Sequence, residues 1–379
     1  MRLMHLADLH LGKILFKRSL LNDQHYILQQ ILEIAAKSDL DGVLIAGDLY
    51  QRNTPQAEAM TELSSFLTAL HGLGLPVYIV SGNHDSAERL AYLSPIAEKS
   101  GIYIASPDAG EIRTVPFEDA YGKGYIHLMS FITPLQIRQR FKEQAETIDS
   151  YDDAVAAVLE AHAVDTSVRN VMVAHQFITG AETSGSEEMS VGGSENIRCS
   201  LFDAYDYVAL GHLHGPQRVG RDTVRYAGSP LKYSFSETGQ KKSVTIVELR
   251  EKGHVTVEQI PLTPLHDMTE LTGTFDALME QGNKDYVHIT LTDEEPPVDA
   301  AKRLRHAFPN LMQTTVRNAK YREDMGVSGD AEPQKNLGFL SMVHDFYAFR
   351  NNGAQISGSQ MEIIHALLDE MNEEGACEQ

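Results

Sequence analysis

The sequence has little cysteine. Among its 379 residues, only Cys199 and Cys377 carry thiols, and neither belongs to a Cys-x-x-Cys pair. Two widely spaced cysteines exclude a disulfide framework and a thiolate zinc site, and they are typical of a protein that works in a reducing compartment. We therefore expect a cytoplasmic location.

Long hydrophobic runs are also absent. Apolar runs such as the one around residues 41–45 are far shorter than the roughly 18 residues that a membrane-spanning helix needs. The first residues, MRLMHLADLHLGK, have no basic stretch followed by a long apolar core, so they lack the pattern of a signal peptide. The sequence predicts no attachment to a membrane.

Basic residues are scarce relative to acidic ones. Lysine and arginine total 32 against 53 aspartate and glutamate residues, which gives a formal net charge of -21. This balance excludes a basic, histone-like DNA binder, because duplex DNA carries about one negative charge per 1.7 Å. A hydrophobic content of 42% excludes a disordered chain. The length allows two or three domains, each with its own core.

The order of apolar segments predicts a layered α/β fold over residues 1–260, because short β-branched runs alternate with amphipathic stretches. The expected strands are 2–6, 42–46, 77–80, 171–174, 207–210, 224–226, 243–249 and 254–260, and the expected helices are 23–36, 55–70 and 87–99. Pro261 and Pro264 mark a boundary.

Beyond this boundary we predict three further parts. A small α/β capping domain spans 264–325, with strand, helix and strand at 286–291, 299–307 and 312–316. A linker follows over 326–336, and a C-terminal helical segment over 337–379 offers apolar faces for docking a partner helix. Residues 330–379 hold nine acidic and two basic side chains, which would suit a basic partner surface.

Five short polar signatures follow expected strands, where loops commonly build sites in α/β sheets. They are Asp8-Leu9-His10, Gly47-Asp48, Gly82-Asn83-His84-Asp85, His175 and Gly211-His212-Leu213-His214. With His84 left aside they offer two carboxylates, one amide oxygen and four imidazoles, which are too many ligands for one transition metal. A pair of divalent ions that shares one carboxylate uses them naturally. Oxygen and nitrogen ligands without thiolates favour Mn²⁺ or Fe²⁺ and tolerate Zn²⁺.

Glycine precedes three of these ligand candidates, Asp48, Asn83 and His212. We expect each glycine to let the backbone turn sharply out of its strand and bring the ligand to the ions.

This ordered set resembles the calcineurin-like metallophosphoesterases, whose pattern is D-x-H, G-D, G-N-H-[DE], H and G-H-x-H. The resemblance covers the chain to about residue 260 and implies a β-sandwich flanked by helices, with hydroxide attack on a phosphodiester between two ions. It implies one ion on Asp8, His10 and His214, a second on Asn83, His175 and His212, and Asp48 as the bridge. His84 would then protonate or stabilise the leaving oxygen.

Three features near these signatures leave alternatives open. Asp85 is either the acidic partner that keeps His84 protonated or the N-cap of a helix that begins near Ser86. Gln51 stands where some members of the superfamily carry a histidine, and an amide donates a hydrogen bond but carries no charge, so that auxiliary role is in doubt. The segment 179–196 is either a loop at the rim of the site that contacts nucleic acid or an ordinary surface excursion.

Within the superfamily, the chain resembles the SbcD family of bacterial nuclease subunits, in the segments HLADLHLGK, GDLYQRNTP, SGNHDSAERL, VGGSENI and YAGSPLKYSFSE. The resemblance implies double-strand 3′–5′ exonuclease and single-strand or hairpin endonuclease activity, with Mn²⁺, in DNA repair, recombination and replication. It also implies an SbcC-like ATPase partner with a coiled coil, and a homodimer through helices 55–70 and 87–99. The chain itself has no GxxxxGK[ST] motif for ATP.

Basic residues after the boundary form a candidate DNA contact. They are Lys302, Arg303, Arg305, Arg317, Lys320 and Arg322, and an ordinary solvated helix face with a basic strand end is an equal alternative.

Two other functions use the same residues differently. A phosphomonoesterase or cyclic-nucleotide phosphodiesterase would share the dimetal centre, but the additional domain after residue 260 disfavours it. A scaffold that anchors an ATPase through an inactive phosphoesterase domain is disfavoured because the ligand set is intact.

Overall fold

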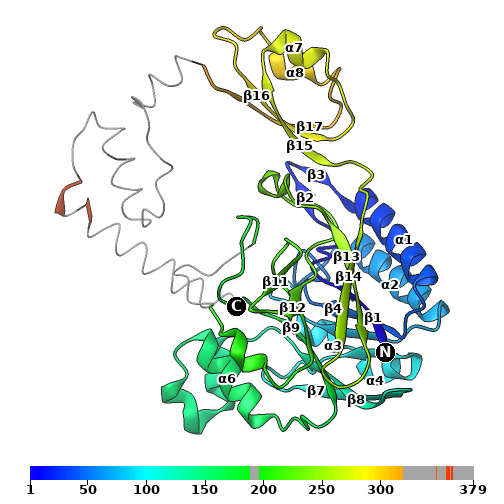
Figure 1. Ribbon diagram of the computed structural model, residues 1–379. Helices are drawn as coiled ribbons and strands as arrows, with labels where there is room; N and C mark the ends of the chain where they lie inside the picture. Colours follow the sequence, from blue (N-terminus) through cyan, green and yellow to red (C-terminus); the bar gives the residue numbers. More distant parts are fainter. Residues whose placement is uncertain (188–195, 319–346, 348–355, 359, 362–379) are drawn as a thin grey trace. The chain divides into compact units, whose positions relative to one another are not determined.

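The computed structural model describes residues 1–187, 196–318, 347, 356–358 and 360–361, and Met1–Val316 form one compact unit. Two six-stranded sheets dominate this unit (Figure 1). The first has the order β14 (Val255–Pro261), β13 (Ser243–Leu249), β1 (Arg2–Leu6), β4 (Gly42–Ala46), β5 (Val77–Val80) and β6 (Ile102–Ile104). The second has the order β11 (Gln217–Val219), β12 (Arg221–Tyr226), β10 (Tyr207–Gly211), β9 (Arg169–His175), β8 (Gly122–Met129) and β7 (Arg113–Asp119).

The inner strands of both sheets are parallel. In the first sheet β1, β4, β5 and β6 run in one direction, and in the second β8, β9, β10 and β12 do. The antiparallel strands β13, β14, β7 and β11 lie toward the edges. Because parallel strands end at the same edge of a sheet, the loops after them gather there.

Alternating side chains place the two sheets face to face. Leu44 of β4 belongs to a core shared with residues of the second sheet such as Val173, whereas its neighbours Val43 and Ile45 pack on the opposite side with helix residues. This alternation follows from the two-residue repeat of a strand. The arrangement is the expected β-sandwich.

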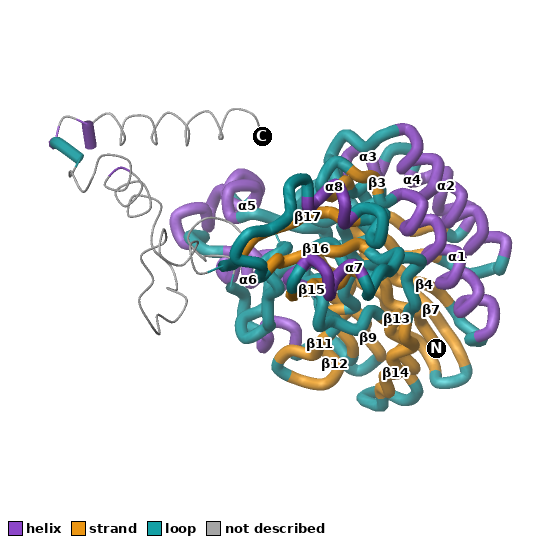
Figure 2. The backbone as a smooth tube through the Cα atoms, turned by 90° about the horizontal axis from the view of Figure 1, so that it is seen from above, coloured by secondary structure: helices purple, strands orange, loops and turns teal. Residues whose placement is uncertain are grey.

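Helices cover the outer face of each sheet (Figure 2). Helices α1 (Leu21–Lys37) and α2 (Ala57–Gly72) cover the first sheet, and α5 (Pro134–Arg140) and α6 (Tyr151–Ala161) cover the second. Among the described residues, no helix is long and apolar enough to cross a membrane.

The single helix predicted over 87–99 is wrong. The segment is divided into α3 (Ala87–Ala91), α4 (Ser94–Ala97) and a 3₁₀ turn at Glu98–Ser100. Leu93 has a left-handed backbone (φ 64°) directly before α4, whose first turn contains Pro95. Proline lacks an N–H and its ring clashes with the carbonyl four residues earlier, so one helix cannot run through this point.

A third, three-stranded sheet follows the boundary at Pro261 and Pro264. It consists of the parallel strands β15 (Met268–Gly273), β16 (Tyr286–Leu291) and β17 (Leu311–Val316), with α7 (Phe275–Met279) and α8 (Ala300–Leu304) on its own small core. The expected strand, helix and strand are β16, α8 and β17, and the structure adds β15 and α7 before them.

The boundaries of the domains stay a prediction. Side chains of the third sheet contact the first part of the chain, because the Tyr286 hydroxyl donates to Asp23 at the start of α1 (2.6 Å). The predicted linker over 326–336 lies outside the described residues. Most of the predicted C-terminal helical segment over 337–379 lies outside them as well.

The chain also forms a short hairpin between the first signature and α1, from β2 (Ile14–Leu15) and β3 (Arg18–Ser19).

Candidate metal centre

The five signatures meet at one edge of the sandwich. Asp8 and His10 follow β1, Asp48 follows β4, and Asn83 and His84 follow β5, all in the first sheet. The second sheet contributes from two neighbouring strands, because His175 ends β9 and the segment His212 to His214 follows β10. Segments far apart in the sequence therefore share one site.

Backbone hydrogen bonds join the loops that carry these residues. The Asp8 amide donates to the Gly47 carbonyl (3.0 Å), and the His10 amide donates to the Asp48 carbonyl (2.9 Å). The His212 amide, from the other sheet, donates to the Asp8 carboxylate (3.0 Å). The φ angles of Asp8, His10, Asp48 and His212 are 53°, 45°, 51° and 99°, which is uncommon for residues other than glycine.

The glycines act differently from the expected sharp turns. Of the three, Gly47 alone has a positive φ (87°), whereas Gly82 and Gly211 are needed because other atoms occupy the place of a side chain. A Cβ at Gly82 would overlap the Asp48 carboxylate, and one at Gly211 would overlap the Ala46 carbonyl. These two glycines therefore allow close approach of the loops.

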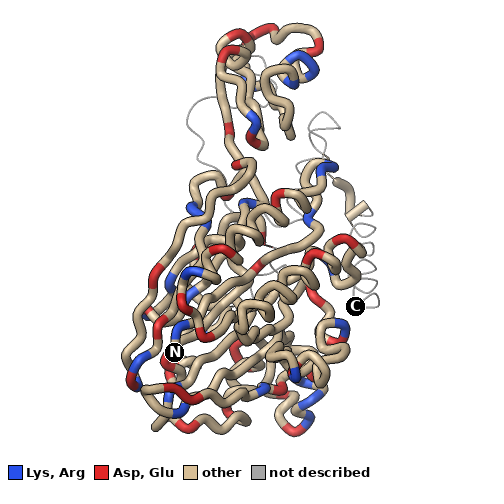
Figure 3. The backbone as a smooth tube through the Cα atoms, turned by 90° about the vertical axis from the view of Figure 1, so that its right-hand side faces the viewer, with Lys and Arg blue, Asp and Glu red and all other residues tan. Residues whose placement is uncertain are grey.

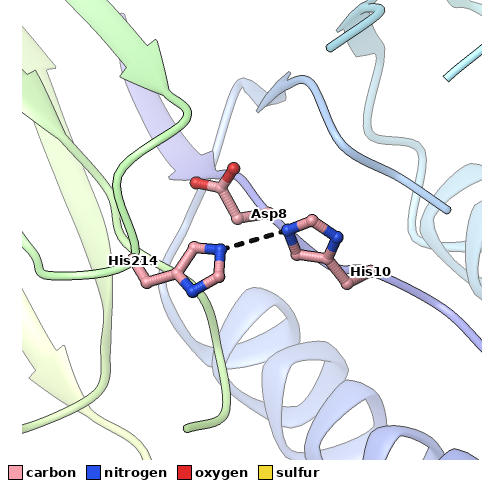
Figure 4. A group of neighbouring side chains, drawn as sticks. All are labelled: Asp8, His10 and His214. Carbon is pink, nitrogen blue, oxygen red and sulfur yellow. Dashed lines mark hydrogen bonds between the residues drawn. The ribbon is translucent and has the colours of Figure 1, made fainter. Parts of the chain in front are cut away.

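Asp8, His10 and His214 form a first group, with potential ligand atoms within 4.8 Å of one another. Figure 4 shows the two imidazoles facing each other beside the carboxylate, and His10 Nε2 lies 3.1 Å from His214 Nε2. All three side chains are buried. These are the three residues predicted to hold one ion.

Asn83, His175 and His212 form a second group. Asn83 Oδ1 lies 3.0 Å from His175 Nε2 and 3.1 Å from His212 Nδ1. Asp48 lies between the groups, since its Oδ2 is 3.5 Å from His10 Nε2 and 3.4 Å from His175 Nε2. The structure thus brings all seven predicted ligands together, with the predicted bridge in the middle.

The charges of the group fit divalent cations. Burial raises the pKa of Asp8 to about 7, even though nearby histidines lower it. Burial also opposes ionisation of Asp48, but the charges of His175 and His10 outweigh it and hold the pKa of Asp48 well below its usual range. Burial lowers the pKa of His175, and Asp48 more than compensates, raising it to about 9. Protons on these side chains occupy places that cations would take, so metal binding would release them.

The positions of the ring nitrogens support the same fit. His10 Nε2 faces both His214 Nε2 (3.1 Å) and Asp48 Oδ2 (3.5 Å), so potential ligand atoms converge on one place. The donor set of carboxylate, amide and imidazole groups suits Mn²⁺, Fe²⁺ or Zn²⁺.

His84 lies beside the two groups and is partly exposed. Its Nδ1 is 3.1 Å from the Gln51 carbonyl oxygen, and its Nε2 is 3.9 Å from Asp48 Oδ2. Gln51 therefore contacts His84 through its backbone, in a way that does not depend on its side chain.

Asp85 joins loops, and its prediction as an N-cap is wrong. Its carboxylate accepts hydrogen bonds from the amides of Leu49, Tyr50 and Gly82, at 3.0–3.1 Å, and so it connects the loops after β4 and β5. The N-cap of α3 is Ser86, whose hydroxyl accepts from the Arg89 amide. The Asp85 carboxylate is therefore already hydrogen-bonded to three loop amides and does not cap α3. Its other predicted role, as the acidic partner of His84, stays a prediction.

Sequence reasoning missed several supporting residues. Gln24 of α1 donates to the carbonyls of Leu9 (3.1 Å) and His10 (2.7 Å) and accepts from the Gly12 amide (3.0 Å). A buried polar side chain on the apolar face of a helix is the signal that marks it. Glu237, which contacts His214, ends the segment YAGSPLKYSFSE but was given no role there. Lys242 was also missed, and no local motif marks it.

The described part of the segment 179–196 reaches the site. Ser186 Oγ lies 3.1 Å from His214 Nδ1, and Glu187 accepts from the His214 amide (3.1 Å). Residues 188–195 lie outside the described part of the chain.

The candidate DNA contacts are exposed where the structure describes them. Lys302, Arg303 and Arg305 lie on or beside α8, and the Arg303 guanidinium lies 4.4 Å from the centre of the Phe275 ring. Arg317 is exposed, whereas Lys320 and Arg322 lie outside the described residues. Basic and acidic positions are interspersed along the backbone of the described part of Met1–Val316 (Figure 3).

Comparisons with known proteins agree with this geometry. Residues 1–216 match the calcineurin-like phosphoesterase family, and residues 264–351 match the family described as type 5 capsule protein repressor C-terminal domain. A curated relative, the D subunit of the nuclease SbcCD from Staphylococcus epidermidis, is 32% identical over 326 residues, which cover 82% of this chain and 84% of the relative.

Two solved structures are more distant. A dimetal phosphatase from Danio rerio is 11% identical with a TM-score of 0.43, over 70% of this chain and 98% of that one. A protein of Thermus thermophilus is 10% identical with a TM-score of 0.38, over 68% and 98%. The family assignment depends on the sequence matches. On those matches, the chain belongs to the calcineurin-like phosphoesterases and, within them, to the SbcD family of nuclease subunits.

Proposed function

We propose that this protein is the nuclease subunit of a DNA-processing complex and hydrolyses phosphodiesters at a centre of two divalent ions, most favourably Mn²⁺. The observation that carries the proposal is the pair of ligand groups on either side of Asp48, which is 3.5 Å from His10 and 3.4 Å from His175. Two ions about 3.5–4 Å apart suit in-line displacement at phosphorus.

Seven side chains would hold the ions in this proposal. Asp8, His10 and His214 would bind one, Asn83, His175 and His212 the other, and Asp48 would bridge them. Bound ions would supply Lewis acidity toward the phosphate and lower the pKa of water between them.

His84 would act on the leaving group. The Gln51 carbonyl fixes its Nδ1, which directs Nε2 toward Asp48 and the partly exposed side of the site. From there it would give a proton to the departing oxygen or stabilise its charge, a role that typically contributes 10²–10⁴-fold.

The substrate and partner extend the proposal. The relative's name places it in a complex named SbcCD, so we infer that an SbcC-like ATPase partners this chain and that DNA is the substrate. Double-strand 3′–5′ exonuclease and single-strand or hairpin endonuclease activity, in DNA repair, recombination and replication, belong to the same proposal. So does a cytoplasmic location. Because the net charge of -21 repels DNA, the ions and the partner would supply most of the attraction.

We also propose a homodimer through the segments 55–70 and 87–99, which contain α2 and the short helices α3 and α4. Met60 of α2 and Tyr92, Leu93 and Ile96 around α3 and α4 are large apolar residues with more than half of their surface exposed. An exposed apolar patch of this kind is typical of an interaction surface.

The decisive test is release of nucleotides from labelled duplex and hairpin DNA with Mn²⁺, with and without the ATPase partner. We expect His84→Gln to lower cleavage at least ~100-fold and to keep Mn²⁺ binding, because His84 acts on the substrate. His254→Gln, at an exposed histidine of a loop, is the matched control. Equal cleavage by wild type and His84→Gln would contradict the proposed mechanism. Faster hydrolysis of p-nitrophenyl phosphate or a cyclic nucleotide than of DNA would favour the alternative function.

A further inference from the structure

A lysine ammonium is buried directly behind the first ligand group. Lys242 is only 6% exposed, and its Nζ donates to Glu237 Oε2 (2.6 Å), Ser229 Oγ (2.8 Å) and the His214 carbonyl (2.9 Å). Gln240 Oε1 lies within 2.7 Å as well. Burying a charge is costly unless it is paired and fully hydrogen-bonded, and these contacts meet that condition. The charge is therefore held in one defined place.

Glu237, the acidic partner of Lys242, also contacts the imidazole of His214. Glu237 has no exposed surface, and its second oxygen, Oε1, lies 3.0 Å from His214 Nδ1. An ionised carboxylate only accepts hydrogen bonds, so this contact requires the proton of His214 to be on Nδ1. The lone pair of the neutral ring is then on Nε2, the atom that faces His10 at 3.1 Å.

We propose that Glu237 and Lys242 are positioning residues, which fix the ring and tautomer of His214 so that Nε2 can bind a divalent ion. The inference rests on the proposed function, in which His214 is a ligand. Lys242 neutralises Glu237 in the interior and also donates to the His214 carbonyl, so one pair of residues holds both the ring and the backbone of the ligand.

The hydroxyl of Ser186 cannot replace Glu237 in fixing the tautomer of His214. Ser186 Oγ lies 3.1 Å from the same Nδ1 atom. A hydroxyl is neutral and can either donate or accept, so by itself it selects no tautomer. Hydrogen bonds to a carboxylate are roughly twice as strong as those between neutral groups, which assigns control of the ring to Glu237.

The test measures metal binding directly. Mn²⁺ is titrated into the full-length protein and free Mn²⁺ is followed by electron paramagnetic resonance, which gives both the number of sites and their affinities. We expect Glu237→Gln to weaken one of the two sites about 10–100-fold and to leave the other unchanged, as is usual when the partner of a metal-bound histidine is altered. The Co²⁺ absorption spectrum should change at the same site.

Three further variants separate positioning from general damage. Lys242→Met should weaken the same site. The double variant Glu237→Gln with Lys242→Met should lose less affinity than the two single losses combined, because the contact between Glu237 and Lys242 is shared, whereas Lys242 also holds the His214 carbonyl on its own. Lys241→Met, at the exposed neighbour of Lys242, is the matched control and should bind Mn²⁺ like wild type. Melting of the metal-free proteins shows which variants are folded, and Glu237→Gln keeps the shape of the side chain.

Each outcome has a separate meaning. Wild-type affinity at both sites in folded Glu237→Gln would overturn the inference and leave the nuclease proposal intact. A wild-type protein that binds two Mn²⁺ ions but cleaves no DNA would overturn the nuclease proposal, while a site-specific loss of affinity in Glu237→Gln would still support the inference.

Discussion

Gly82 shows how closely single residues are constrained at this site. The place that its Cβ would take is occupied by the Asp48 carboxylate, and the Asp48 amide lies 2.5 Å from it. A methyl group there must displace the loop that carries the proposed bridging ligand. Since protein interiors are close-packed, such a displacement is felt by every neighbour.

We predict that Gly82→Ala removes Mn²⁺ binding and lowers the free energy of unfolding by about 1–3 kcal/mol, the usual cost of overpacking. Calorimetric titration and urea unfolding measure the two effects. Gly72→Ala is the matched control, because a Cβ there meets nothing within 4 Å at the end of α2. Full Mn²⁺ affinity in Gly82→Ala would show that the loop after β5 can shift at no cost.

At the scale of elements, α1 links the site to the third sheet through consecutive residues. Gln24 holds the carbonyls of Leu9 and His10, whereas Asp23 accepts from Tyr286 of β16. The two side chains are about 100° apart around the helix, so one turn serves both neighbours. The position of the first signature thus depends on α1.

We predict that Gln24→Leu lowers the free energy of unfolding by about 2–4 kcal/mol and weakens Mn²⁺ binding, because it leaves buried backbone groups without partners. Urea unfolding with and without Mn²⁺ separates the two effects. Gln29→Leu, on the exposed face of the same helix, should change neither. Unfolding curves of Gln24→Leu that match those of Gln29→Leu would mean that the loop after β1 keeps its conformation without support from α1.

The sequence predicts some of these elements well. Strands β1, β4, β5, β13 and β16 have the expected bounds. Every residue of β4 and β5 is buried, and strands buried on both faces give continuous apolar runs between turn residues. The helix over 87–99 failed because its apolar spacing continues across Pro95, where the backbone cannot.

The residues of the candidate site also divide into those that the sequence predicts and those that it does not. The seven proposed ligands are marked by their order after strands, and the structure gathers them. Glu237 and Lys242 have no such mark, since their contacts to His214 depend on how distant segments pack. The N-cap prediction for Asp85 failed because local sequence does not show the amides of Leu49 and Tyr50 nearby.

At the scale of the whole molecule, buried neutral histidines connect stability to pH. His5 is fully buried between the Tyr207 hydroxyl and the Leu210 carbonyl, and burial lowers its pKa from 6.5 to about 3. Burial also lowers the pKa of His127, in the second sheet, to about 4. Below pH 6.5 the unfolded chain takes up protons at both positions and the folded protein does not. The folded protein therefore becomes less stable as the pH is lowered.

We predict that the free energy of unfolding decreases between pH 6.5 and about 4, with each histidine contributing a slope of about 1.4 kcal/mol per pH unit. Urea unfolding of the metal-free protein at several pH values measures it. His127→Gln should remove one such contribution, and His254→Gln, at an exposed position, is the matched control. If the free energy of unfolding depends on pH in the same way in His127→Gln and in wild type, His127 does not contribute to the slope.

The backbone of the metal centre has a consequence for evolution. Asp8, His10, Asp48 and His212 all have positive φ angles, which disfavour residues with a side chain by about 1–2 kcal/mol each. Glycine would relieve this strain at every one of these positions, and it would delete a proposed ligand each time. At positions 8 and 48 glycine would also remove a carboxylate that accepts the amide of His212 or His84, which offsets the gain. A library selected for heat resistance alone would therefore drift toward glycine at positions 10 and 212, and the surviving proteins would be more stable and would lack two proposed ligands.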